Sequence, residues 1–162
     1  MNLNLQNQLK KILNGRFSQS ESTRANYARG EDTYDPVLSQ AVVFPETNEE
    51  VSQILKLCNE NKVPVVPFGT GTSLEGHAVG NDKGITISLE KMNKVLVVNT
   101  EDFDCRVQAC VTREQLNEYL REDGVFFPID PGANAAIGGM ASTSASGTMA
   151  VKYGTMKSVI TG

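Results

Sequence analysis

Apolar side chains at the start of the chain are spaced for a helix, whereas the stretch that follows has no regular spacing. Leucine and isoleucine residues recur three or four positions apart through residues 3–13, which predicts an amphipathic helix that stops at Gly15. Residues 16–39 are polar and aperiodic, with two tyrosines and an Asp-Pro step. We therefore expect residues 1–40 to supply a leading helix and an extended segment that docks on the rest of the chain.

A strand, a capped helix and a second strand come next. Residues 41–44 form an apolar run closed by a proline, and Thr47 with Glu50 makes a capping box that predicts a helix. The apolar face of this helix is formed by Val51, Ile54, Leu55 and Cys58. Residues 63–66 are a second short apolar run. This order predicts a right-handed strand–helix–strand crossover that leads into a glycine-rich loop.

Predicted strands lie closer together in the second half of the chain. The apolar patterns of residues 84–89 and 95–98 predict a third and a fourth strand, and alternation through residues 105–111 predicts a fifth. Thr112 and Gln115 then cap another helix, whose apolar positions and terminal glycine are Leu116, Tyr119, Leu120 and Gly124.

The change from a strand–helix–strand order to closely spaced short strands predicts an α+β fold with a subdomain boundary near residues 98–103. We expect a leading segment at 1–40, a first subdomain at 41–100 and part of a second subdomain at 101–162. Residues 158–161 have the composition of a strand, so the second subdomain is expected to be incomplete where the sequence stops.

Composition and charge narrow the possible partners. The chain has 162 residues, 40% of them hydrophobic, which is enough for a core of its own. A formal charge of −4 without a basic block argues against a nucleic-acid-binding surface. No apolar run is long enough to span a bilayer, and the first residues lack the features of a signal peptide. The cytoplasm is therefore the default location.

Cysteine and histidine usage excludes several kinds of site. The three cysteines have no CxxC spacing, so they predict neither a disulfide framework nor a zinc ribbon. In a strand, Cys105 and Cys110 would point to opposite faces, and we expect the cysteines to be core thiols. His77 is the single histidine, which excludes a metal site that needs several imidazoles.

Residues 64–80 are the most informative stretch of the first half. A short apolar run bracketed by prolines leads into a loop of glycines and hydroxyl residues. Gly69 and Gly71 can adopt a positive φ, so that successive backbone N–H groups converge on one point. Thr70, Thr72 and Ser73 add hydroxyl groups beside them. The loop is therefore predicted to bind an anion such as a phosphate.

Familiar nucleotide-binding motifs do not fit this loop. Gly71 and Gly76 have the spacing of a Walker A motif, but His77 and Ala78 stand where lysine and Ser/Thr are required. A dinucleotide fingerprint that starts at Gly69 meets leucine where its third glycine should be. The alternative to a phosphate site is a glycine-rich turn that only joins two strands.

Residues 128–155 form a second informative stretch. Almost every side chain from 133 to 145 is small, which lets the backbone approach a flat partner closely and supplies many N–H and hydroxyl donors. Larger apolar residues are threaded through the stretch, and they argue against a flexible linker. Tight packing against another part of the chain is the alternative to a ligand site.

Together the two stretches resemble one family. Pro-Phe-Gly-Thr-Gly-Thr-Ser-Leu-Glu-Gly-His at 67–77 resembles the pyrophosphate loop of FAD-linked oxidoreductases of the vanillyl-alcohol oxidase type, whose flavin domain is called PCMH-type. The run from Asp-Pro-Gly-Ala-Asn to Tyr-Gly-Thr-Met at 130–156 resembles their second flavin loop. Within the family, both motifs are most similar to cytochrome-linked D-lactate dehydrogenases and then to glycolate oxidase flavin subunits.

The resemblance assigns cofactor-binding residues in both loops. It implies that the FAD pyrophosphate is held by Gly69, Thr70, Gly71, Thr72 and Ser73. It implies that the rest of FAD is lined by Pro131, Gly132, Ala133, Gly138, Gly139, Ser142 and Gly147. The sequence departs from many relatives, which have Asn, Asn and Gly, at Met140, Ser144 and Ser146.

The resemblance also implies a function for a longer protein. It predicts non-covalent FAD, a D-2-hydroxy acid substrate such as D-lactate or glycolate, and a cytochrome or quinone as electron acceptor, with a location peripheral to the inner membrane. Relatives carry their substrate-binding histidines and arginine beyond the region that corresponds to residue 162, so we expect an amino-terminal fragment without catalytic residues or metal. Alone it is expected to be inactive, to bind FAD weakly and to self-associate. The alternative function is a non-catalytic FAD-binding or scaffold subunit of an oxidase.

Overall fold

The computed structural model describes residues 1–161 and contains the mixed helices and sheets of the predicted α+β fold. The chain divides into two compact units, residues 1–91 and residues 92–162, and each is described by itself. The break between the units comes before the predicted boundary at 98–103, because these residues lie inside a β-hairpin of the second unit. How the FAD-binding subdomains divide the chain stays a prediction.

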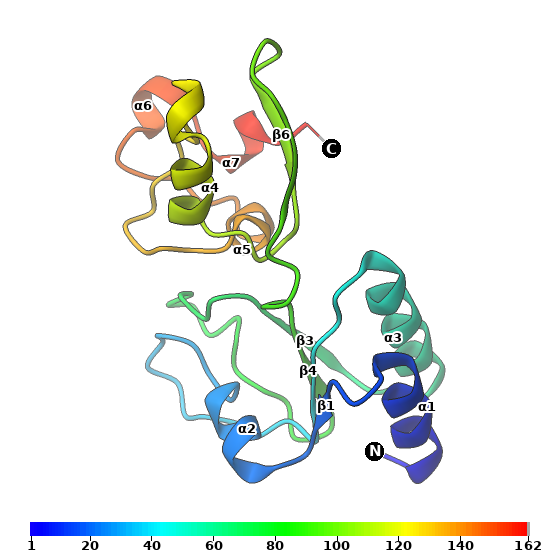
Figure 1. Ribbon diagram of the computed structural model, residues 1–162. Coiled ribbons are helices and arrows are strands. Elements are labelled where there is room, and N and C mark those ends of the chain that lie inside the picture. The colour runs from blue at the N-terminus through cyan, green and yellow to red at the C-terminus, as the bar shows by residue number, and fades with distance from the viewer. Residues whose placement is uncertain (162) are drawn as a thin grey trace. The chain divides into compact units, whose positions relative to one another are not determined.

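Unit 1 is built on a four-stranded sheet (Figure 1). Its strands are β1 (Phe17–Ser18), β2 (Val42–Val43), β3 (Val65–Phe68) and β4 (Ile85–Ser88), in the order β1-β2-β4-β3. β4 runs parallel to both of its neighbours, and β1 is antiparallel to β2. The predicted strand–helix–strand unit is therefore present, but β4 is inserted between its two strands. All four residues of β4 are buried, including the hydroxyl residues Thr86 and Ser88.

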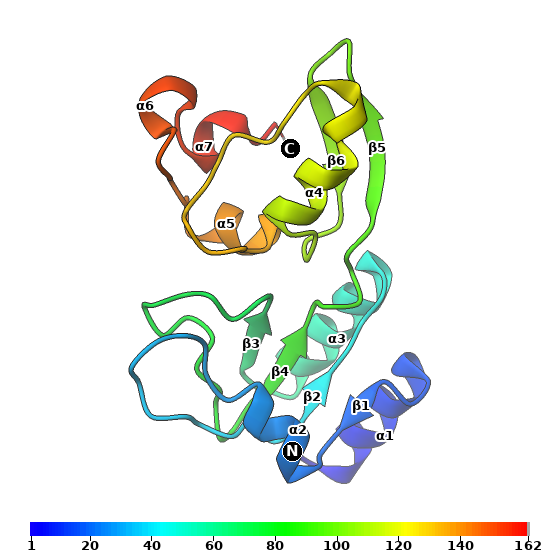
Figure 2. The same cartoon turned by 60° about the vertical axis from the view of Figure 1, so that its left-hand side comes forward.

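Two helices cover one face of this sheet, α1 (Leu3–Leu13) and α3 (Asn48–Glu60) (Figure 2). Both begin at a side-chain cap: Asn2 accepts the N–H of Leu5, and Thr47 accepts the N–H of Glu50. The core beneath them is formed by Leu5, Leu9, Leu13, Ala41, Val43, Ile54, Cys58, Ile85 and Ile87. On α3 the predicted apolar face is only partly buried, since the Leu55 side chain is 46% exposed.

Residues 16–39 are more ordered than their polar sequence predicts. They contain β1 and a short helix, α2 (Glu21–Asn26), where an extended segment was expected. Ser20 caps α2 by accepting the N–H of Thr23. No residue of α2 is buried, so the helix leaves no apolar periodicity in the sequence. The capping residue Ser20 was the sequence feature from which this helix could have been predicted.

Unit 2 begins with an antiparallel ribbon of two strands, β5 (Val95–Asn99) and β6 (Asp104–Val107), with an irregularity at Leu96. A helix, α4 (Arg113–Tyr119), packs on one face of the ribbon and continues as η1 (Arg121–Asp123) to a left-handed glycine. Thr112 caps α4 as predicted, by accepting the N–H of Gln115. The contacts join Val111, Leu116 and Leu120 to Val95, Val98 and Val107. Tyr119 is not part of this core, because its side chain is 59% exposed.

Three short helices complete unit 2: α5 (Ile137–Ser142), α6 (Ala150–Tyr153) and α7 (Met156–Val159). The buried side chains of Ile129, Ala135, Met140 and Met156 form their small core. The strand predicted for residues 158–161 is wrong. Residues 156–159 are helical because Met156 is fully buried and the N–H of Ile160 closes a helical turn on its carbonyl.

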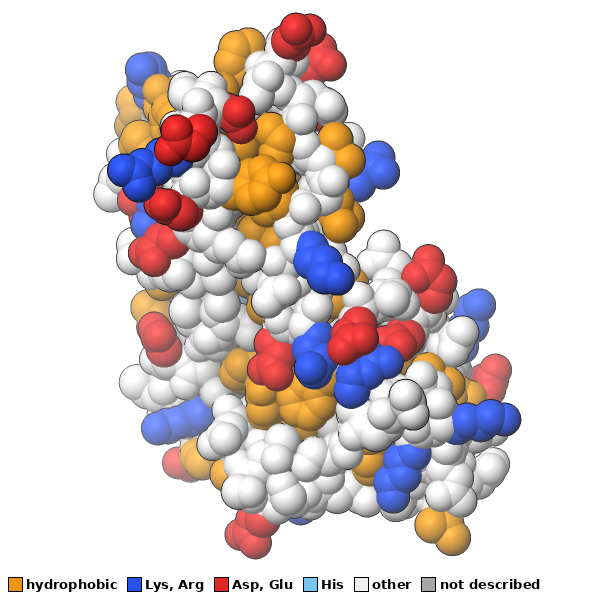
Figure 3. Space-filling model, in the orientation of Figure 1, with side chains coloured by type: hydrophobic (Ala, Val, Ile, Leu, Met, Phe, Trp, Pro, Cys, Tyr) orange, Lys and Arg blue, Asp and Glu red, His pale blue; other side chains and the backbone are white. Residues whose placement is uncertain are grey.

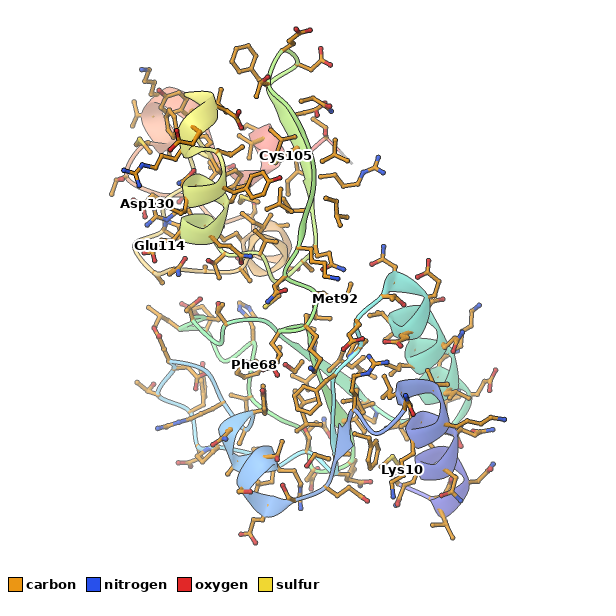
Figure 4. All side chains as sticks on the ribbon, in the orientation of Figure 1. Lys10, Phe68, Met92, Cys105, Glu114 and Asp130 are labelled. Carbon is orange, nitrogen blue, oxygen red and sulfur yellow. The ribbon has the colours of Figure 1, made fainter. Side chains whose placement is uncertain are left out.

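The cysteines differ in burial. Cys58 and Cys110 are buried, and burial raises the pKa of the Cys58 thiol to about 11. Cys105, on β6 (Figure 4), is exposed, so the prediction of three core thiols is wrong for this residue. β6 ends at Val107, three residues before Cys110, so the predicted alternation does not extend over the whole of 105–111.

Charges of both signs are interspersed on the molecular face that Figure 3 shows, without a broad basic patch. Within residues 1–161, no helix is long and apolar enough to cross a membrane.

A bidentate ion pair joins the start of β1 to the first turn of α3. The two terminal nitrogens of Arg16 lie 2.7 and 2.5 Å from the two carboxylate oxygens of Glu50, and Arg16 also donates to the carbonyl of Phe44 at 3.0 Å. Both side chains are about four-fifths buried, with exposed fractions of 20% and 18%. The pKa of Glu50 is lowered, first by the hydrogen bond from Arg16.

Replacing Glu50 with glutamine is expected to lower the free energy of unfolding by about 1–2 kcal/mol near neutral pH, because the neutral amide weakens both hydrogen bonds to Arg16. Since the folded-state pKa lies below the ordinary value of 4.5, the carboxylate stabilises the fold above that pH. This contribution is lost as the pH falls through the lowered pKa.

Urea unfolding of the unsubstituted and Glu50→Gln chains, near neutral pH and in acid, measures this effect. Glu49→Gln, an exposed change in the same helical turn, is the control and should leave stability unaltered. A stability difference for Glu50→Gln that stays constant as the pH falls below the ordinary carboxyl pKa would contradict the assignment.

Candidate functional site

The glycine-rich loop starts at the carboxyl end of β3, which is where sheets with parallel strands commonly hold ligands. Phe68, the last residue of β3, is buried beneath the loop (Figure 4). Gly71 has φ +72° and lies so close to the Phe68 ring that an added Cβ would be 2.8 Å from it. The predicted positive φ is therefore found at Gly71. Gly69 does not have one, and Gly76 supplies the second instead.

This loop has backbone donors without acceptors. Among the hydrogen bonds of residues 1–161, the N–H groups of Gly69 and of residues 71–73 donate to no protein atom. The hydroxyl groups contact one another: Thr70 Oγ1 lies 3.3 Å from Thr72 Oγ1, and Ser73 Oγ lies 2.7 Å from His77 Nδ1. Such a set of preorganised, unpaired N–H groups is suited to hold an anion.

A segment that the sequence left without a role lies against this loop. Figures 1 and 2 both show residues 28–37 beside residues 70–80. The N–H of Glu31 donates to the carbonyl oxygen of Gly71 at 2.8 Å. Residues far apart in sequence and without a motif make this contact, so only the folded structure reveals it.

In unit 2, the second loop bends at Gly132, which has φ +92° and open space around it. Asp130 forms this bend by accepting the N–H of Gly132 at 3.1 Å, and its carboxylate lies 3.5 Å from Arg113 Nε (Figure 4 labels Asp130). Pro131 beside the bend is exposed and Ala133 is half-buried. Arg113 lies on α4 and forms this ion pair with Asp130. Nothing in the sequence around Arg113 predicts the contact.

Two predicted site glycines of unit 2 serve close packing. A Cβ at Gly138 would lie 2.8 Å from the Ala109 side chain, and a Cβ at Gly147 would lie 1.9 Å from the carbonyl oxygen of Asp130. The N–H of Gly138 donates to the Ala109 carbonyl at 2.8 Å, and Ser142 Oγ donates to the carbonyl of Gly138. These contacts are compatible with both interpretations of residues 128–155, tight packing and a ligand site.

Gly139 differs from its neighbour. An added Cβ at Gly139 would meet nothing within 4 Å, and the residue is exposed on α5. No packing requirement in the described structure explains the glycine. The open backbone at Gly132 and Gly139 is where a flat ligand could approach unit 2 most closely.

Residues 1–161 contain no group of three His, Cys, Asp or Glu side chains that could hold a metal ion. The two loops offer a ligand backbone N–H groups, hydroxyl groups and open backbone at glycines.

Comparison with known proteins shows the family to which the chain belongs. The family described as "FAD binding domain" matches residues 39–162, three-quarters of the chain, and both loops lie within the match. The chain belongs to the FAD binding domain family. The predicted vanillyl-alcohol oxidase type of fold is confirmed, and FAD is the cofactor of the family.

Two curated relatives of this FAD binding domain are dehydrogenases by name. The chain is 47% identical over 140 residues to the Danio rerio protein "Probable D-lactate dehydrogenase, mitochondrial", covering 86% of this chain and 28% of that protein. It is 43% identical over 152 residues to the Arabidopsis thaliana "D-lactate dehydrogenase [cytochrome], mitochondrial", covering 93% and 27%. The chain thus spans little more than a quarter of these relatives. Their names give no support to the expected cytoplasmic location.

A solved structure titled "alkyldihydroxyacetonephosphate synthase in P212121" shares the fold of this domain with a TM-score of 0.88. The similarity covers 97% of this chain and 32% of that one, at 22% sequence identity. At this identity the likeness shows the fold and not the activity.

The residues of the glycine loop fit the cofactor of the family. FAD carries two linked phosphates, and the loop presents unpaired backbone N–H groups at the carboxyl end of a strand, where a phosphate can be held without basic side chains. Gly71 also keeps the backbone close to Phe68, which no residue with a side chain could do without displacing the ring.

Replacing Gly138 with alanine is expected to lower the free energy of unfolding by about 1–3 kcal/mol, because the new methyl group would overlap Ala109. The adjacent Gly139→Ala change is the matched control. It meets open space within a helix and should leave stability unchanged or raise it by up to about 1 kcal/mol. Urea unfolding of both variants tests the contrast, and equal destabilisation by the two changes would disprove it.

Proposed function

We propose that the whole protein to which this chain belongs is an FAD-dependent dehydrogenase of D-2-hydroxy acids, with D-lactate as the first candidate and glycolate as the second. The glycine loop with its unpaired N–H groups carries the proposal, because it offers a site for the FAD pyrophosphate. The names of the Danio rerio and Arabidopsis relatives support D-lactate as the substrate.

In this proposal the residues of unit 1 bind the phosphates. The N–H groups of Gly69 and residues 71–73, with the hydroxyl group of Thr70, hold the pyrophosphate and fix its position before substrate arrives. FAD, when bound, accepts the hydride from the α-carbon of the hydroxy acid. His77 lies within hydrogen-bond distance of Ser73, and the proposal assigns it a role in loop structure. In the same proposal FAD is bound without a covalent link.

Residues of unit 2 line the cofactor in the same proposal. Gly132 and Gly139 let the backbone approach closely, and Pro131 and Ala133 flank the bend. The remaining residues of the set are Gly138, Ser142 and Gly147. Gly138 and Gly147 hold the loop in shape through close backbone packing, and Ser142 does so through its hydroxyl group, so that all three contribute to the lining.

A second candidate is a non-catalytic FAD-binding or scaffold subunit. The observation that favours it is that the single histidine of the chain pairs with Ser73, so this chain offers no evident group to activate a hydroxy acid. The enzyme proposal assigns that task to the rest of the protein. It also assigns electron transfer to a cytochrome or quinone and a position beside the membrane that holds this acceptor.

Anaerobic mixing of the full-length protein with D-lactate, glycolate and D-2-hydroxyglutarate tests the enzyme proposal. We expect D-lactate to bleach the flavin absorbance, and the L-enantiomer to leave it unchanged as a control. Acid precipitation should release the flavin into the supernatant, as non-covalent binding requires. FAD that stays oxidised with all three hydroxy acids would favour the scaffold subunit.

The chain of residues 1–162 alone is expected to bind FAD weakly and to turn over no substrate, because it spans little more than a quarter of its relatives. Micromolar affinity requires about 8 kcal/mol of net binding energy, and we expect FAD bound to this chain alone to fall short of that value. Flavin fluorescence titration measures this. Submicromolar binding, or flavin reduction by D-lactate, would contradict it.

We propose further that this isolated chain self-associates through the β5–β6 ribbon. Within residues 1–161 the ribbon has two strands only, and it exposes Leu96, Val97 and, between the strands, an 83% exposed Phe103. Unpaired strand edges and apolar side chains favour contact with another copy. Sizing of the same preparation over a range of concentrations should show a species larger than a monomer, and a monomer throughout would refute this part.

A further inference from the structure

Two loops of unit 1 are in backbone contact at two places. Residues 28–37 follow α2, and residues 70–80 form the glycine-rich loop. A Cβ at Gly30 would lie 2.4 Å from the carbonyl oxygen of Gly71 and 3.2 Å from that of Ser73. No residue other than glycine fits at position 30 without displacing the phosphate loop. The N–H of Glu31 donates to the same Gly71 oxygen at 2.8 Å.

The other end of the contact is equally tight. The carbonyl oxygen of Ala28 accepts the N–H of Val37 at 3.2 Å and the N–H of Gly80 at 2.9 Å. A Cβ at Gly80 would lie 1.9 Å from the Val37 carbonyl oxygen. The 28–37 loop is therefore closed at its base by the same acceptor that holds the end of the glycine-rich loop.

A buried carboxylate holds the tip of the 28–37 loop in shape. Asp32 is 7% exposed, and its two oxygens accept the N–H groups of Gly30 and Tyr34, each at 3.1 Å. No ion pair with a basic side chain is found for Asp32 in the described part of the chain. The Tyr34 ring in turn lies against Gly76, where a Cβ would be 2.8 Å from it.

These contacts decide where the phosphate-binding donors point. The Gly71 carbonyl and the Thr72 N–H belong to one planar trans peptide group, in which the C=O and N–H bonds point in opposite directions. Because Glu31 holds the Gly71 oxygen toward the 28–37 loop, the Thr72 N–H is directed to the other side. That N–H has no acceptor within residues 1–161.

We propose that residues 28–37 are a positioning clamp for the phosphate-binding loop, with Asp32 as its positioning residue. Asp32 sets the conformation of Gly30 and Glu31, and these fix the peptide group that aims the Thr72 N–H at the FAD pyrophosphate. The proposal rests on the proposed function, because it assumes that the loop binds FAD. It gives a role to a segment whose sequence contains no cofactor motif.

The test replaces Asp32 with asparagine in the full-length protein and measures FAD binding to the apoprotein by flavin fluorescence. An asparagine amide presents one oxygen and one NH₂ group, so one of the two N–H groups loses its acceptor. We expect the Kd for FAD to rise about tenfold, as the loss of about one hydrogen bond implies, with unchanged binding stoichiometry. ADP carries a pyrophosphate without the flavin ring, and its Kd should rise by a similar factor.

Whether the Kd for FAD rises or falls in Asp32→Asn separates a positioning role from an effect of charge. Removing a negative charge near a phosphate site should by itself strengthen anion binding, so a rise in Kd has to come from geometry. Asp35→Asn removes the same charge from an exposed position in the same loop and is the matched control, with a Kd for FAD expected to stay unchanged or to fall slightly. A purely structural role for Asp32 would reduce the number of binding sites through unfolding and leave the Kd of the folded protein as it was.

A Kd change of less than threefold for Asp32→Asn at full stoichiometry would overturn the clamp, as would a lower stoichiometry with an unaltered Kd. If this variant does not fold, Gly30→Ala, which pushes directly on the Gly71 oxygen, replaces it with the same thresholds. Failure of the unsubstituted full-length protein to bind FAD or ADP would overturn the proposed function together with the clamp. Normal FAD binding with an unaffected variant would overturn the clamp alone.

Discussion

Close approach of backbone to backbone at glycine is the constraint on which both candidate cofactor loops depend. Among the described glycines, an added Cβ would come within 3 Å of a backbone atom from a distant part of the chain at Gly30, Gly80, Gly84, Gly138 and Gly147. Each of these contacts brings a carbonyl oxygen against a glycine Cα, where any larger residue would force the two segments apart. The loops are therefore defined by packing before they meet a ligand.

The same packing creates the donors that a cofactor needs. In unit 1 the carbonyl of Gly71 faces the 28–37 loop, and the buried ring of Phe68 supports the Gly71 backbone from β3. With its carbonyl held inward, the loop presents the neighbouring N–H groups without acceptors. An anion site of this kind needs no lysine or arginine, which agrees with a chain of net charge −4 that belongs to an FAD-binding family.

Local chemistry was predictable from the sequence, and non-local packing was not. Thr47 and Thr112 cap their helices as predicted, because a cap depends on residues three positions away. The insertion of β4 between β2 and β3 depends on strand pairing over long distances, which periodicity does not encode. Alternation predicts the face of a strand but not whether that face is covered, so Cys105 was wrongly predicted to be buried. The composition of the glycine loop was enough to predict it. The residues packed against the loop determine which of its glycines have a positive φ.

Composition alone cannot separate a glycine that packs from a glycine that faces a ligand, and unit 2 shows how the structure does so. Gly138 and Gly147 have neighbours at van der Waals distance or closer, and this packing alone explains why they are glycine. Gly132 and Gly139 have open space around them. The positive φ of Gly132 explains why that residue is a glycine, but Gly139 has no positive φ. Gly139 is left without a conformational or packing reason within residues 1–161. That Gly139 contacts the cofactor therefore stays a prediction, one with which its open surroundings are compatible.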